Sequence, residues 1–506
     1  MSAVQSDVAH DIPDTDGKAR RLVIVGGGIA GLSAAWYAQQ AAAQRGITLH
    51  TTILEAAGRW GGKVLTEQID GPGGGYLLEA GADALLTHKP WAVALARELG
   101  VDAQLVGGQE ANSRTFVLHR NRLQPLPKGL QLLAPTQVWP FARSPLFSLS
   151  GKVRIGLEAL IPPRRDTGDE SLADFVRRRF GREALETLAE PLMADVYSMD
   201  SSRQSIQATF PQFPTLEAQY GSVIRGVRGA ARQARQRTAA PSAAPTLPFV
   251  SFDQGIQTLV DALVSRLSLT TTLRLHSAVD RVVRLPAGSY RVLLADGTHV
   301  EADTVIVATP ARAAADFLRE AAPVAAARLS AIRYASIGNA YLAYRRSDVS
   351  HPLNGYGAVI PRGEGRRIDG MSWTSSKWAG RAPAHHVLLR IFFGGPHTRA
   401  LAAVADEELL AIVREEVTAL LGVQAPPLFQ RVYRWSDGYP QYEIGHLARV
   451  SAIEAALPAG LSVTGSAYRG IGVPDCVRQG QEAAQRAMTA LAAAMRAEAP
   501  EGKHTV

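Results

Sequence analysis

Arg21-Leu22-Val23-Ile24-Val25-Gly26-Gly27-Gly28-Ile29-Ala30-Gly31 is the stretch on which the fold prediction rests. A short apolar run that leads straight into glycines is typical of a buried parallel strand. The following residues, 29–44, are rich in alanine and have helical spacing, and 48–54 are β-branched and apolar. We therefore expect a strand–helix–strand unit at the front of a parallel sheet.

The glycines of this stretch have the G-x-G-x-x-G spacing of a dinucleotide-binding turn, at Gly26, Gly28 and Gly31. The first permits a tight turn, the second lets the backbone approach a pyrophosphate, and the third allows close packing of helix on strand. The pyrophosphate would lie at the positive end of the helix. The pattern alone is weak, but it follows a strand and opens a helix, as the motif requires.

Glu55 closes the second expected strand, where a carboxylate can accept hydrogen bonds from ribose hydroxyls and would repel the 2′-phosphate of NADP. The run Gly58-Arg59-Trp60-Gly61-Gly62-Lys63 follows. Its Arg-x-Gly-Gly pattern is typical of a large flavoprotein superfamily, since the glycines allow a second close approach and the cations can meet phosphate oxygens. The alternatives without a binding role are a surface glutamate at position 55 and an ordinary glycine turn at 58–63. The front of the chain therefore favours FAD over NAD.

A second strand–glycine–helix pattern lies near the other end of the chain. The apolar run 461–464 leads into Gly465, and we expect a helix from Arg478. Backbone amides at Ile471, Gly472 and Val473 could lie against an isoalloxazine ring, and a positive helix end would stabilise a reduced, anionic flavin. Cys476 could be a flavin attachment point or a nucleophile, but we interpret it as a buried, inert thiol. The two ends of the chain thus predict one flavin site.

Composition excludes several other classes of function. The chain has 506 residues, 46% of them hydrophobic, one cysteine and a net charge of +8. It allows no intrachain disulfide, no apolar run is long enough to span a membrane, and no cysteine–histidine cluster suggests a metal. The basic stretch 225–237 is interpreted as a solvated loop, so nucleic acid is not an expected partner. Residues 1–18 have no apolar core, so they do not resemble a signal peptide.

The pattern along the chain predicts an α/β (α+β multi-domain) fold. The family resemblance that the motifs between the two ends carry implies three parts: a Rossmann-like FAD-binding domain, a substrate domain built on a mixed sheet, and a helical insertion. The expected ranges are 1–20 for a disordered extension, 21–110, 251–330 and 431–495 for the FAD-binding domain, 111–250 for the helical insertion with the start of the substrate domain, 331–430 for the substrate domain, and 496–506 for a flexible tail.

Several further motifs occur in a fixed order between the two ends. They are Glu79-Ala80-Gly81-Ala82-Asp83, Thr374-Ser375-Ser376-Lys377-Trp378 with Arg381-Ala382-Pro383, Leu389-Arg390, and Pro440-Gln441-Tyr442 with Gly445-His446. With the two glycine turns, this set resembles the oxygen-dependent porphyrinogen oxidases of haem synthesis, over roughly residues 21–490. The wider superfamily includes amine oxidases and carotenoid desaturases.

The resemblance implies a six-electron oxidation of a porphyrinogen to a porphyrin, with three O2 consumed and three H2O2 released. It implies a helical insertion that can touch a membrane, and a propionate anchor at Arg114. The basic charge and the Ser-Ser-Lys-Trp segment favour coproporphyrinogen III, with protoporphyrinogen IX as the alternative. The implied flavin contacts are Gly26, Gly27, Gly28, Ile29, Ala30, Gly31, Glu55, Ala56, Lys63, Gly81, Ala82, Asp83, Ala84, Val279, Trp435, Ile471, Gly472 and Val473.

One departure from the family pattern is the run 194–197, Ala-Asp-Val-Tyr, where the family usually has a glycine. It puts the local geometry of the helical insertion in question. Among the other candidates, Arg390 is a weaker anchor than Arg114, and Tyr439 and Tyr442 either wall the flavin or pack in the core. We interpret His446 as a structural hydrogen-bonding residue. No side chain is assigned to acid–base catalysis, because hydride transfer to a flavin needs little of it.

Three competing functions remain open at this point. The chain could be an amine oxidase-like flavoprotein, a redox-inactive flavin or haem-pathway carrier, or a membrane-bound assembly protein. Turnover of porphyrinogens against amines separates the first from the expected activity. We expect a cytoplasmic enzyme whose partners are a porphyrinogen and O2, and leave peripheral membrane contact and a homodimer open.

Overall fold

A five-stranded parallel sheet gathers segments from the whole length of the chain. The computed structural model describes residues 19–131, 133–166, 168–194, 197–237 and 248–498; the expected extension before residue 19 and the last eight residues of the expected tail lie outside these ranges. The strand order is β12 (Thr271–Arg274), β2 (Leu49–Leu54), β1 (Arg20–Val25), β16 (Thr304–Val307) and β22 (Leu461–Val463). All four pairings are parallel, which confirms the expected strand–helix–strand unit.

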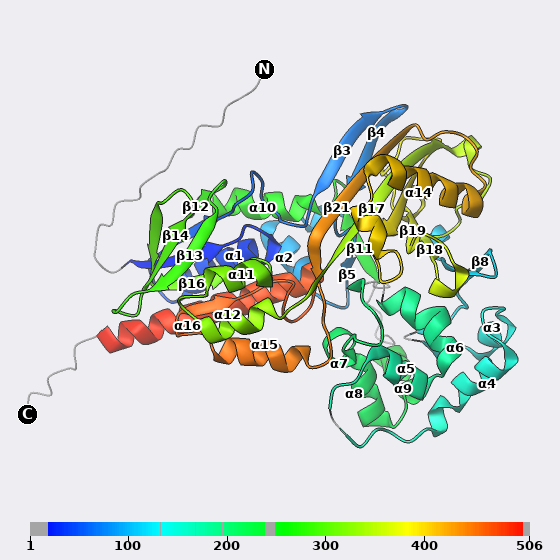
Figure 1. Cartoon of the computed structure of the whole chain (residues 1–506), viewed down its shortest axis with the longest axis horizontal. Helices are drawn as coiled ribbons and strands as arrows, with labels where there is room; N and C mark the ends of the chain where they lie inside the picture. Colours follow the sequence, from blue (N-terminus) through cyan, green and yellow to red (C-terminus); the bar gives the residue numbers. More distant parts are fainter. Residues whose placement is uncertain (1–18, 132, 167, 195–196, 238–247, 499–506) are drawn as a thin grey trace, which may run out of the picture.

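Helices from both ends of the chain cover one face of this sheet. Glycine allows α1 (Ile29–Gln44) and α16 (Val473–Glu498) to lie side by side, because a Cβ at Gly480 would stand 2.6 Å from the Ala30 carbonyl oxygen. The bounds of α1 agree with the prediction. On the same side pack α2 (Trp91–Leu99) and α10 (Gln257–Leu267) (Figure 1).

The start of α16 differs from the prediction. The helix begins at Val473 instead of Arg478. Pro474 stands in its first turn, where the missing amide hydrogen costs nothing because the first amides of a helix have no internal partner. Of the predicted ring contacts, Ile471 and Gly472 therefore directly precede the helix, and Val473 is its first residue.

The opposite face of the parallel sheet is covered by a small antiparallel sheet and three helices. The sheet is formed by β13 (Val279–Arg284), β14 (Tyr290–Leu294) and β15 (His299–Ala302), and the helices are α11 (Ala311–Phe317), α12 (Pro323–Ser330) and α15 (His446–Ala455).

A seven-stranded mixed sheet forms the second layer of the molecule (Figure 1). All of its pairings are antiparallel except that of β18 with β7, and α14 (Asp406–Leu421) packs on it. The expected boundary at 431 cuts through β21, which pairs with β17 almost throughout and so lies in this sheet. The order is β21 (Phe429–Pro440), β17 (Tyr334–Arg345), β20 (His386–Phe393), β19 (Gly370–Trp373), β18 (Gly357–Val359), β7 (Thr115–His119) and β8 (Arg122–Pro125).

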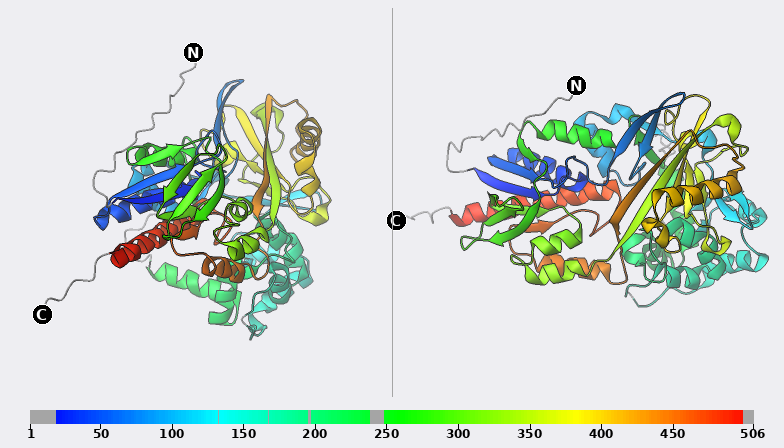
Figure 2. Two further views of the ribbon diagram at one scale, coloured as in Figure 1. Left: turned by 60° about the vertical axis from the view of Figure 1, so that its left-hand side comes forward. Right: turned by 45° about the horizontal axis from the view of Figure 1, so that its top comes forward.

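Short elements connect the two sheets. The expected hairpin is formed by β3 (Thr66–Gly71) and β4 (Gly74–Glu79), and it rises beside β21 (Figure 2). A three-stranded sheet has the order β5 (Leu85–Leu86), β11 (Phe249–Phe252) and β6 (Leu105–Gly107). A single helical turn, α13 (Thr374–Lys377), joins β19 to β20.

A helical layer lies under the mixed sheet (Figure 2). Its π-helical segment, Leu185–Ala194, contains Pro191, whose ring and missing amide hydrogen disturb ordinary α-helical bonding. The departure noted at 194–197 is only partly open to description, since residues 195 and 196 lie outside the described ranges. The layer contains α3 (Val138–Arg143), α4 (Leu149–Gly156), α5 (Leu172–Arg179), α6 (Arg182–Ala184), α7 (Ile206–Thr209), α8 (Gln212–Tyr220), α9 (Val223–Arg237) and the two-stranded pair β9 (Leu130–Gln131) and β10 (Ala134–Pro135).

The expectation of a loop at 225–237 is wrong, because this stretch belongs to α9. Its first amides, at Val223 and Ile224, donate to the carboxylate of Glu158, and the hydroxyl of Ser222 also bonds that carboxylate. Glu158 in turn forms a fully buried ion pair with Arg179. Part of the cap comes from Glu158, which is far away in sequence and could not be found from the local pattern, and part from the adjacent Ser222, whose hydroxyl accepts the amide of Arg225 at 3.1 Å.

Replacing Glu158 with alanine should destabilise the protein by about 3 kcal/mol, because it leaves the buried Arg179 with only its longer contact to Glu217, at 3.4 Å, and removes the acceptor of the first two amides of α9. Urea unfolding followed by circular dichroism measures this. The matched control is Glu186→Ala, which breaks the exposed pair with Arg182 and should leave the free energy of unfolding almost unchanged. Equal losses in the two variants would contradict this assignment.

Candidate functional site

The glycine turn after β1 lies where three parallel strands end. A Cβ at Gly26, whose φ is +109°, would stand 2.9 Å from the carbonyl oxygen of Ala308, which follows β16. A Cβ at Gly31 would stand 2.0 Å from the Gly26 carbonyl oxygen, so helix and strand touch backbone to backbone. Gly465, which follows β22, lies against Ala30 with the corresponding distance at 3.8 Å. The predicted front and back turns therefore meet at one sheet edge.

Glu55 fixes the conformation of the front turn through hydrogen bonds. Its two carboxylate oxygens accept hydrogen bonds from the amides of Gly27, at 2.7 Å, and Ala57, at 2.8 Å. A carboxylate has about four lone-pair positions, so it retains room for ribose hydroxyls. The neighbouring Ala56 is exposed, and the Glu55 carbonyl accepts the amide of Ser277, which brings the start of β13 and Val279 to the same place.

The Arg-x-Gly-Gly run closes over the front turn. A Cβ at Gly27 would stand 2.4 Å from the ring of Trp60, and one at Gly62 would stand 3.1 Å from the Cα of Gly28. The guanidinium of Arg59 donates to the carbonyls of its own loop, including that of Val64 at 3.0 Å. Arg59 thus shapes the loop, and its predicted phosphate contact stays a prediction.

Lys63 joins the two turns directly. Its ammonium donates to the hydroxyl of Ser466 at 3.3 Å, and burial lowers its pKa. Its charge also acts on Cys476, whose thiol burial raises to a pKa of about 12. The cysteine is therefore a neutral, buried thiol at physiological pH, as predicted.

Aromatic side chains support the back turn through hydrogen bonds and stacking. Tyr442 donates to the Ser466 carbonyl at 2.8 Å and accepts the amide of Gly470 at 2.9 Å. His446 stacks on Tyr442, with ring centroids 4.0 Å apart, and donates from Nε2 to the Tyr468 carbonyl at 2.8 Å. His446 is thus a structural residue, as predicted, and Tyr442 packs in the core beside Ile471.

Asp475 is in the first turn of α16. A Cβ at Gly470, whose φ is +126°, would stand 2.5 Å from its side chain, and its carboxylate pairs with Lys89 at 2.7 Å. Because Lys89 stands just before α2, this ion pair also connects Gly472 and Val473 to the N-terminal part of the chain. Lys89 had no sequence signal, because its partner is more than 380 residues away.

The segment Ala80–Ala84 lies between the front turn and the mixed sheet. The Ala80 carbonyl accepts from Trp435 Nε1 and Asn339 Nδ2, both at 2.9 Å. A Cβ at Gly81 would stand 2.0 Å from the Lys63 carbonyl oxygen. The predicted residues 81–84 and Trp435 are therefore brought together against the Lys63 loop, and Ala82 packs on the main core.

Asp83 interacts with two cations, one from α13 and one from β20 of the mixed sheet. It pairs with Lys377 at 2.7 Å and lies 3.9 Å from Arg390, whose other nitrogen donates to the Gly81 carbonyl at 2.6 Å. Burial alone would raise the pKa of Asp83, but the charges of Lys377 and Arg390 hold it below its usual value. Arg390 is buried in these contacts, so it serves the fold of this segment more than a substrate.

Arg114 stands apart from these pairs. Its side chain is exposed at the start of β7, and no hydrogen bond or ion pair of its guanidinium occurs among the described residues. Its carbonyl accepts the amide of Tyr356, whose ring packs edge-on against Phe249 at 5.3 Å. Phe249 in turn contacts Trp378 at 5.6 Å. An unpaired cation thus borders an aromatic cluster.

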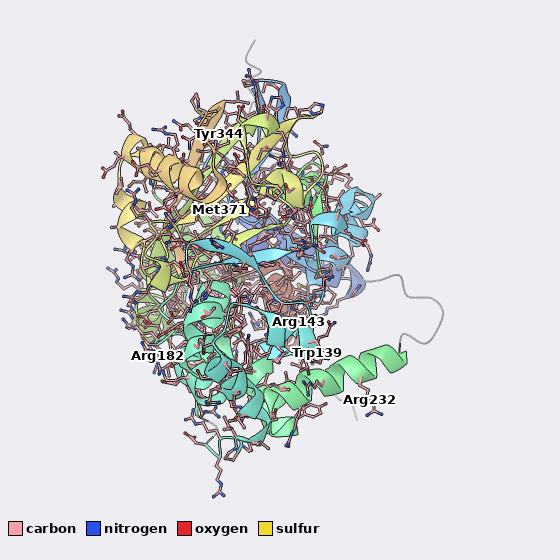
Figure 3. All side chains as sticks on the ribbon, turned by 90° about the vertical axis from the view of Figure 1, so that its right-hand side faces the viewer. Trp139, Arg143, Arg182, Arg232, Tyr344 and Met371 are labelled. Atoms are coloured by element: carbon pink, nitrogen blue, oxygen red, sulfur yellow. The ribbon has the colours of Figure 1, made fainter. Side chains whose placement is uncertain are left out.

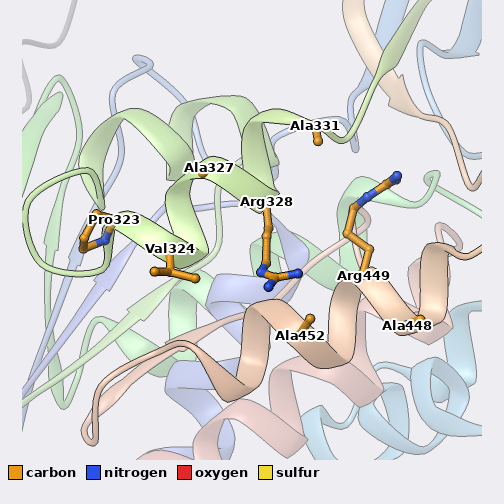
Figure 4. A pocket seen from close by; sticks show the side chains of 8 residues that line it. All are labelled: Pro323, Val324, Ala327, Arg328, Ala331, Ala448, Arg449 and Ala452. Atoms are coloured by element: carbon orange, nitrogen blue, oxygen red, sulfur yellow. The ribbon is translucent and has the colours of Figure 1, made fainter.

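The groove between α12 and α15 is a separate feature (Figure 4). It encloses about 890 Å³ and is lined by Pro323, Val324, Ala327, Arg328, Ala331, Ala448, Arg449 and Ala452. None of these belongs to the glycine turns or the other predicted cofactor contacts, so the groove is not the candidate site.

The residues at the sheet edge fit an extended dinucleotide. Two helix starts, at Ile29 and Val473, meet there with bare glycine backbone, where negatively charged phosphates are stabilised. The buried hydroxyl oxygens of Thr309 and Thr464, which follow β16 and β22, have no hydrogen-bond partner within the described ranges. Buried hydroxyls without a partner favour a bound ligand at this edge.

Comparison with known proteins agrees with this geometry. The family of flavin containing amine oxidoreductases matches residues 29–488. The chain belongs to this family. It is 34% identical over 484 residues to the coproporphyrinogen III oxidase of Bacillus subtilis, covering 94% of this chain and 99% of that protein. It is therefore an oxidoreductase with a flavin cofactor, among the porphyrinogen oxidases.

Two further relatives support the assignment. The chloroplastic protoporphyrinogen oxidase of rice is 32% identical over 489 residues, covering 92% of this chain and 87% of that protein. A solved structure from Exiguobacterium, named for protoporphyrinogen oxidase, has a TM-score of 0.80 at 29% identity and covers 94% of this chain and 99% of that one. The predicted fold class and family are thus confirmed.

Acid should destabilise the protein through His446. Burial lowers its pKa to about 4, whereas an unfolded imidazole titrates near 6.5. The stabilising contribution is therefore present above pH 6.5 and is lost as the pH falls through 4, by up to about 3 kcal/mol. Urea unfolding of the wild type and of His446→Gln between pH 4 and 7 measures it, and parallel pH profiles would contradict it.

Proposed function

We propose that this protein binds FAD at the shared sheet edge and oxidises coproporphyrinogen III to coproporphyrin III. The observation that carries the proposal is the meeting of the front and back glycine turns, joined by Lys63 and Ser466, beside a substrate sheet. When bound, FAD supplies the two-electron acceptor that no side chain of this protein offers. The named relatives from Bacillus and rice support a porphyrinogen as the substrate.

The aromatic cluster beside Arg114 suits such a substrate. A porphyrinogen is an apolar macrocycle with carboxylate arms, so it needs apolar walls and a few cations. The half-buried rings of Phe249 and Tyr356 offer the apolar surface, the buried Trp378 packs against Phe249, and Arg114 is exposed without a partner among the described residues. Lys377 and Arg390 are engaged with Asp83, which leaves Arg114 as the better anchor for a propionate.

The protein contributes orientation and electrostatics to the reaction. The starts of α1 and α16 and the ammonium of Lys63 provide positive potential where negative charge gathers during reduction. Gln109 and Asn112 donate to the Ser375 and Ser376 carbonyls, which ties the loop before Arg114 to α13. Each hydride removed is accompanied by the loss of one proton from the substrate, and together they supply the two hydrogens of each H2O2. We assign no side chain as the proton acceptor, and O2 is the proposed final electron acceptor, with three H2O2 formed per porphyrin.

Anaerobic mixing with each purified porphyrinogen tests the proposal. Coproporphyrinogen III should bleach the yellow flavin absorbance, and readmitted O2 should restore it with release of three peroxides per porphyrin formed. Protoporphyrinogen IX should react with lower kcat/KM, and simple amines should not react. Bleaching by an amine instead, or no bleaching by either porphyrinogen, would overturn the assignment.

Arg114→Gln should raise KM for coproporphyrinogen III about tenfold with kcat within about twofold, since one charge-assisted hydrogen bond to substrate is lost. Steady-state kinetics measures this, with Arg319→Gln as the control because that exposed arginine pairs with Asp316 on α11. An unchanged KM would remove Arg114 as the anchor.

We also propose that the outer edge of the helical layer rests on an anionic membrane surface. Trp139, Leu149 and Leu160 are 73%, 80% and 73% exposed, and the exposed Val153 is one turn after Leu149 on α4. Arg143 stands over the Trp139 ring at 5.5 Å, beside α9 (Figure 3). Apolar side chains flanked by cations are typical of interfacial binding. No helix in the described part of the chain is long and apolar enough to cross a bilayer.

Flotation with vesicles tests this contact. The wild type should float with vesicles that contain about 30% anionic lipid, and the double variant Trp139→Ser, Leu149→Ser should bind at least about tenfold more weakly, because two apolar side chains no longer leave water. Leu269→Ser is the matched control, since Leu269 is 77% exposed but lies outside the helical layer. Equal flotation of all three proteins would exclude the contact.

A further inference from the structure

Glu79, the last residue of β4, is a buried carboxylate at the junction of three segments. It is 1% exposed. One of its oxygens accepts the amide of Ile256, at the start of α10, at 2.8 Å, and the other accepts the hydroxyl of Thr66, on β3, at 2.8 Å. The Thr66 hydroxyl accepts the amide of Gln257 at 3.1 Å, which closes the junction.

The backbone of Glu79 is tied to the mixed sheet at the same point. Its amide donates to the hydroxyl of Tyr341, on β17, and that hydroxyl donates to the Glu79 carbonyl, both at 3.0 Å. Gly255, with φ at +91°, leaves room for the carboxylate, because a Cβ there would stand 2.8 Å from it. Glu79 therefore links β3, β17 and α10.

The residues that follow Glu79 are the segment Ala80–Ala84, which lies against the Lys63 loop and is expected to contact the flavin. Gly81 stands on the Lys63 carbonyl, and Ala80 accepts bonds from Asn339 and Trp435 of the mixed sheet. A small movement of Glu79 would pass directly into this segment, because no residue separates it from Ala80.

Glu79 forms no ion pair with any of the residues that the structure describes. The charge of Arg381 acts on Glu79, but the Arg381 guanidinium donates to the Phe252 and Asp253 carbonyls and to the Ser251 hydroxyl. The other ionisable groups that act on Glu79 or Arg381 are Asp83, Tyr341 and Asp253. Burial raises the pKa of Glu79 to about 7, against the opposing effects of Ile256, Thr66 and Arg381.

We propose that Glu79 is a positioning residue for the oxidation, a role that rests on the proposed function: its ionised carboxylate, bonded to Thr66 and Ile256, holds Ala80–Ala84 against the Lys63 loop. The ionised group accepts both donors in charge-assisted hydrogen bonds, whereas the neutral acid keeps its contact with Thr66 only as a weaker neutral bond in which the Thr66 hydroxyl must turn from donor to acceptor. The active alignment therefore belongs to the ionised form.

Glu79→Gln imitates the neutral form without changing the size of the side chain. In the wild type, kcat should rise between pH 6 and 8 as Glu79 loses its proton. In the variant this rise should be absent, with kcat about tenfold below the wild type at pH 8 and KM within about twofold. Thr66→Val removes a donor to the charged form and should move the inflection up by about one pH unit.

Hydrogen exchange of the flavin-free protein provides a readout that does not depend on turnover. Peptides that cover 80–84 should exchange faster in Glu79→Gln than in the wild type at pH 8, and at similar rates at pH 6. The matched control is Glu67→Gln on the same hairpin, whose side chain pairs at the surface with Arg431 and should leave both measurements unchanged.

A pH profile of Glu79→Gln that overlays the wild type, or equal exchange at pH 8, would overturn the positioning role. A lower unfolding midpoint with an unchanged pH profile would also overturn it, because that result indicates a structural role alone. Should neither porphyrinogen reduce the wild-type flavin, the proposed function fails, while the exchange experiment still decides the role of Glu79.

Discussion

Direct backbone contact between α1 and β1 is the constraint on which the rest of the site depends. The carbonyl oxygen of Gly26 lies where the side chain of any other residue at position 31 would stand. This contact draws the helix start down to the sheet edge, and Gly480 allows α16 to approach α1 in the same way. Two positive helix ends can then face one extended anion, which neither end could hold alone.

The second layer of the molecule is joined to this edge through buried polar contacts. Asp83 lies beside Lys377 of α13 and Arg390 of the mixed sheet, and Trp435 and Asn339 of the same sheet donate to the Ala80 carbonyl. Such contacts are strong where water is excluded, and they fix orientation as well as distance. The mixed sheet is thereby held in one relation to the edge of the parallel sheet, as the proposed hydride transfer between two bound molecules would require.

Local patterns were sufficient for the parts of the fold that are locally encoded. The apolar run before Gly26, the alanine-rich helix to Gln44 and the hairpin glycines each have a chemical cause within a few residues. The long-range parts were not accessible. The first amides of α9 donate to the distant Glu158, and Lys89 donates to Asp475. Arg59 donates to backbone carbonyls of its own loop, including that of Val64. The cofactor roles of the individual residues stay predictions, because hydrogen bonds within the protein do not identify a ligand.

The order of strands in the parallel sheet has a consequence for biosynthesis. β1 is made first, yet its neighbour β16 pairs on its other side with β22, which leaves the ribosome near the end of synthesis. α1 must wait equally long for α16, so its apolar face stays uncovered during most of translation. Contacts of such wide sequence separation form slowly and expose the nascent chain to aggregation. Cells that make this enzyme would therefore benefit from chaperones that shield the amino-terminal third until the carboxy-terminal helix arrives.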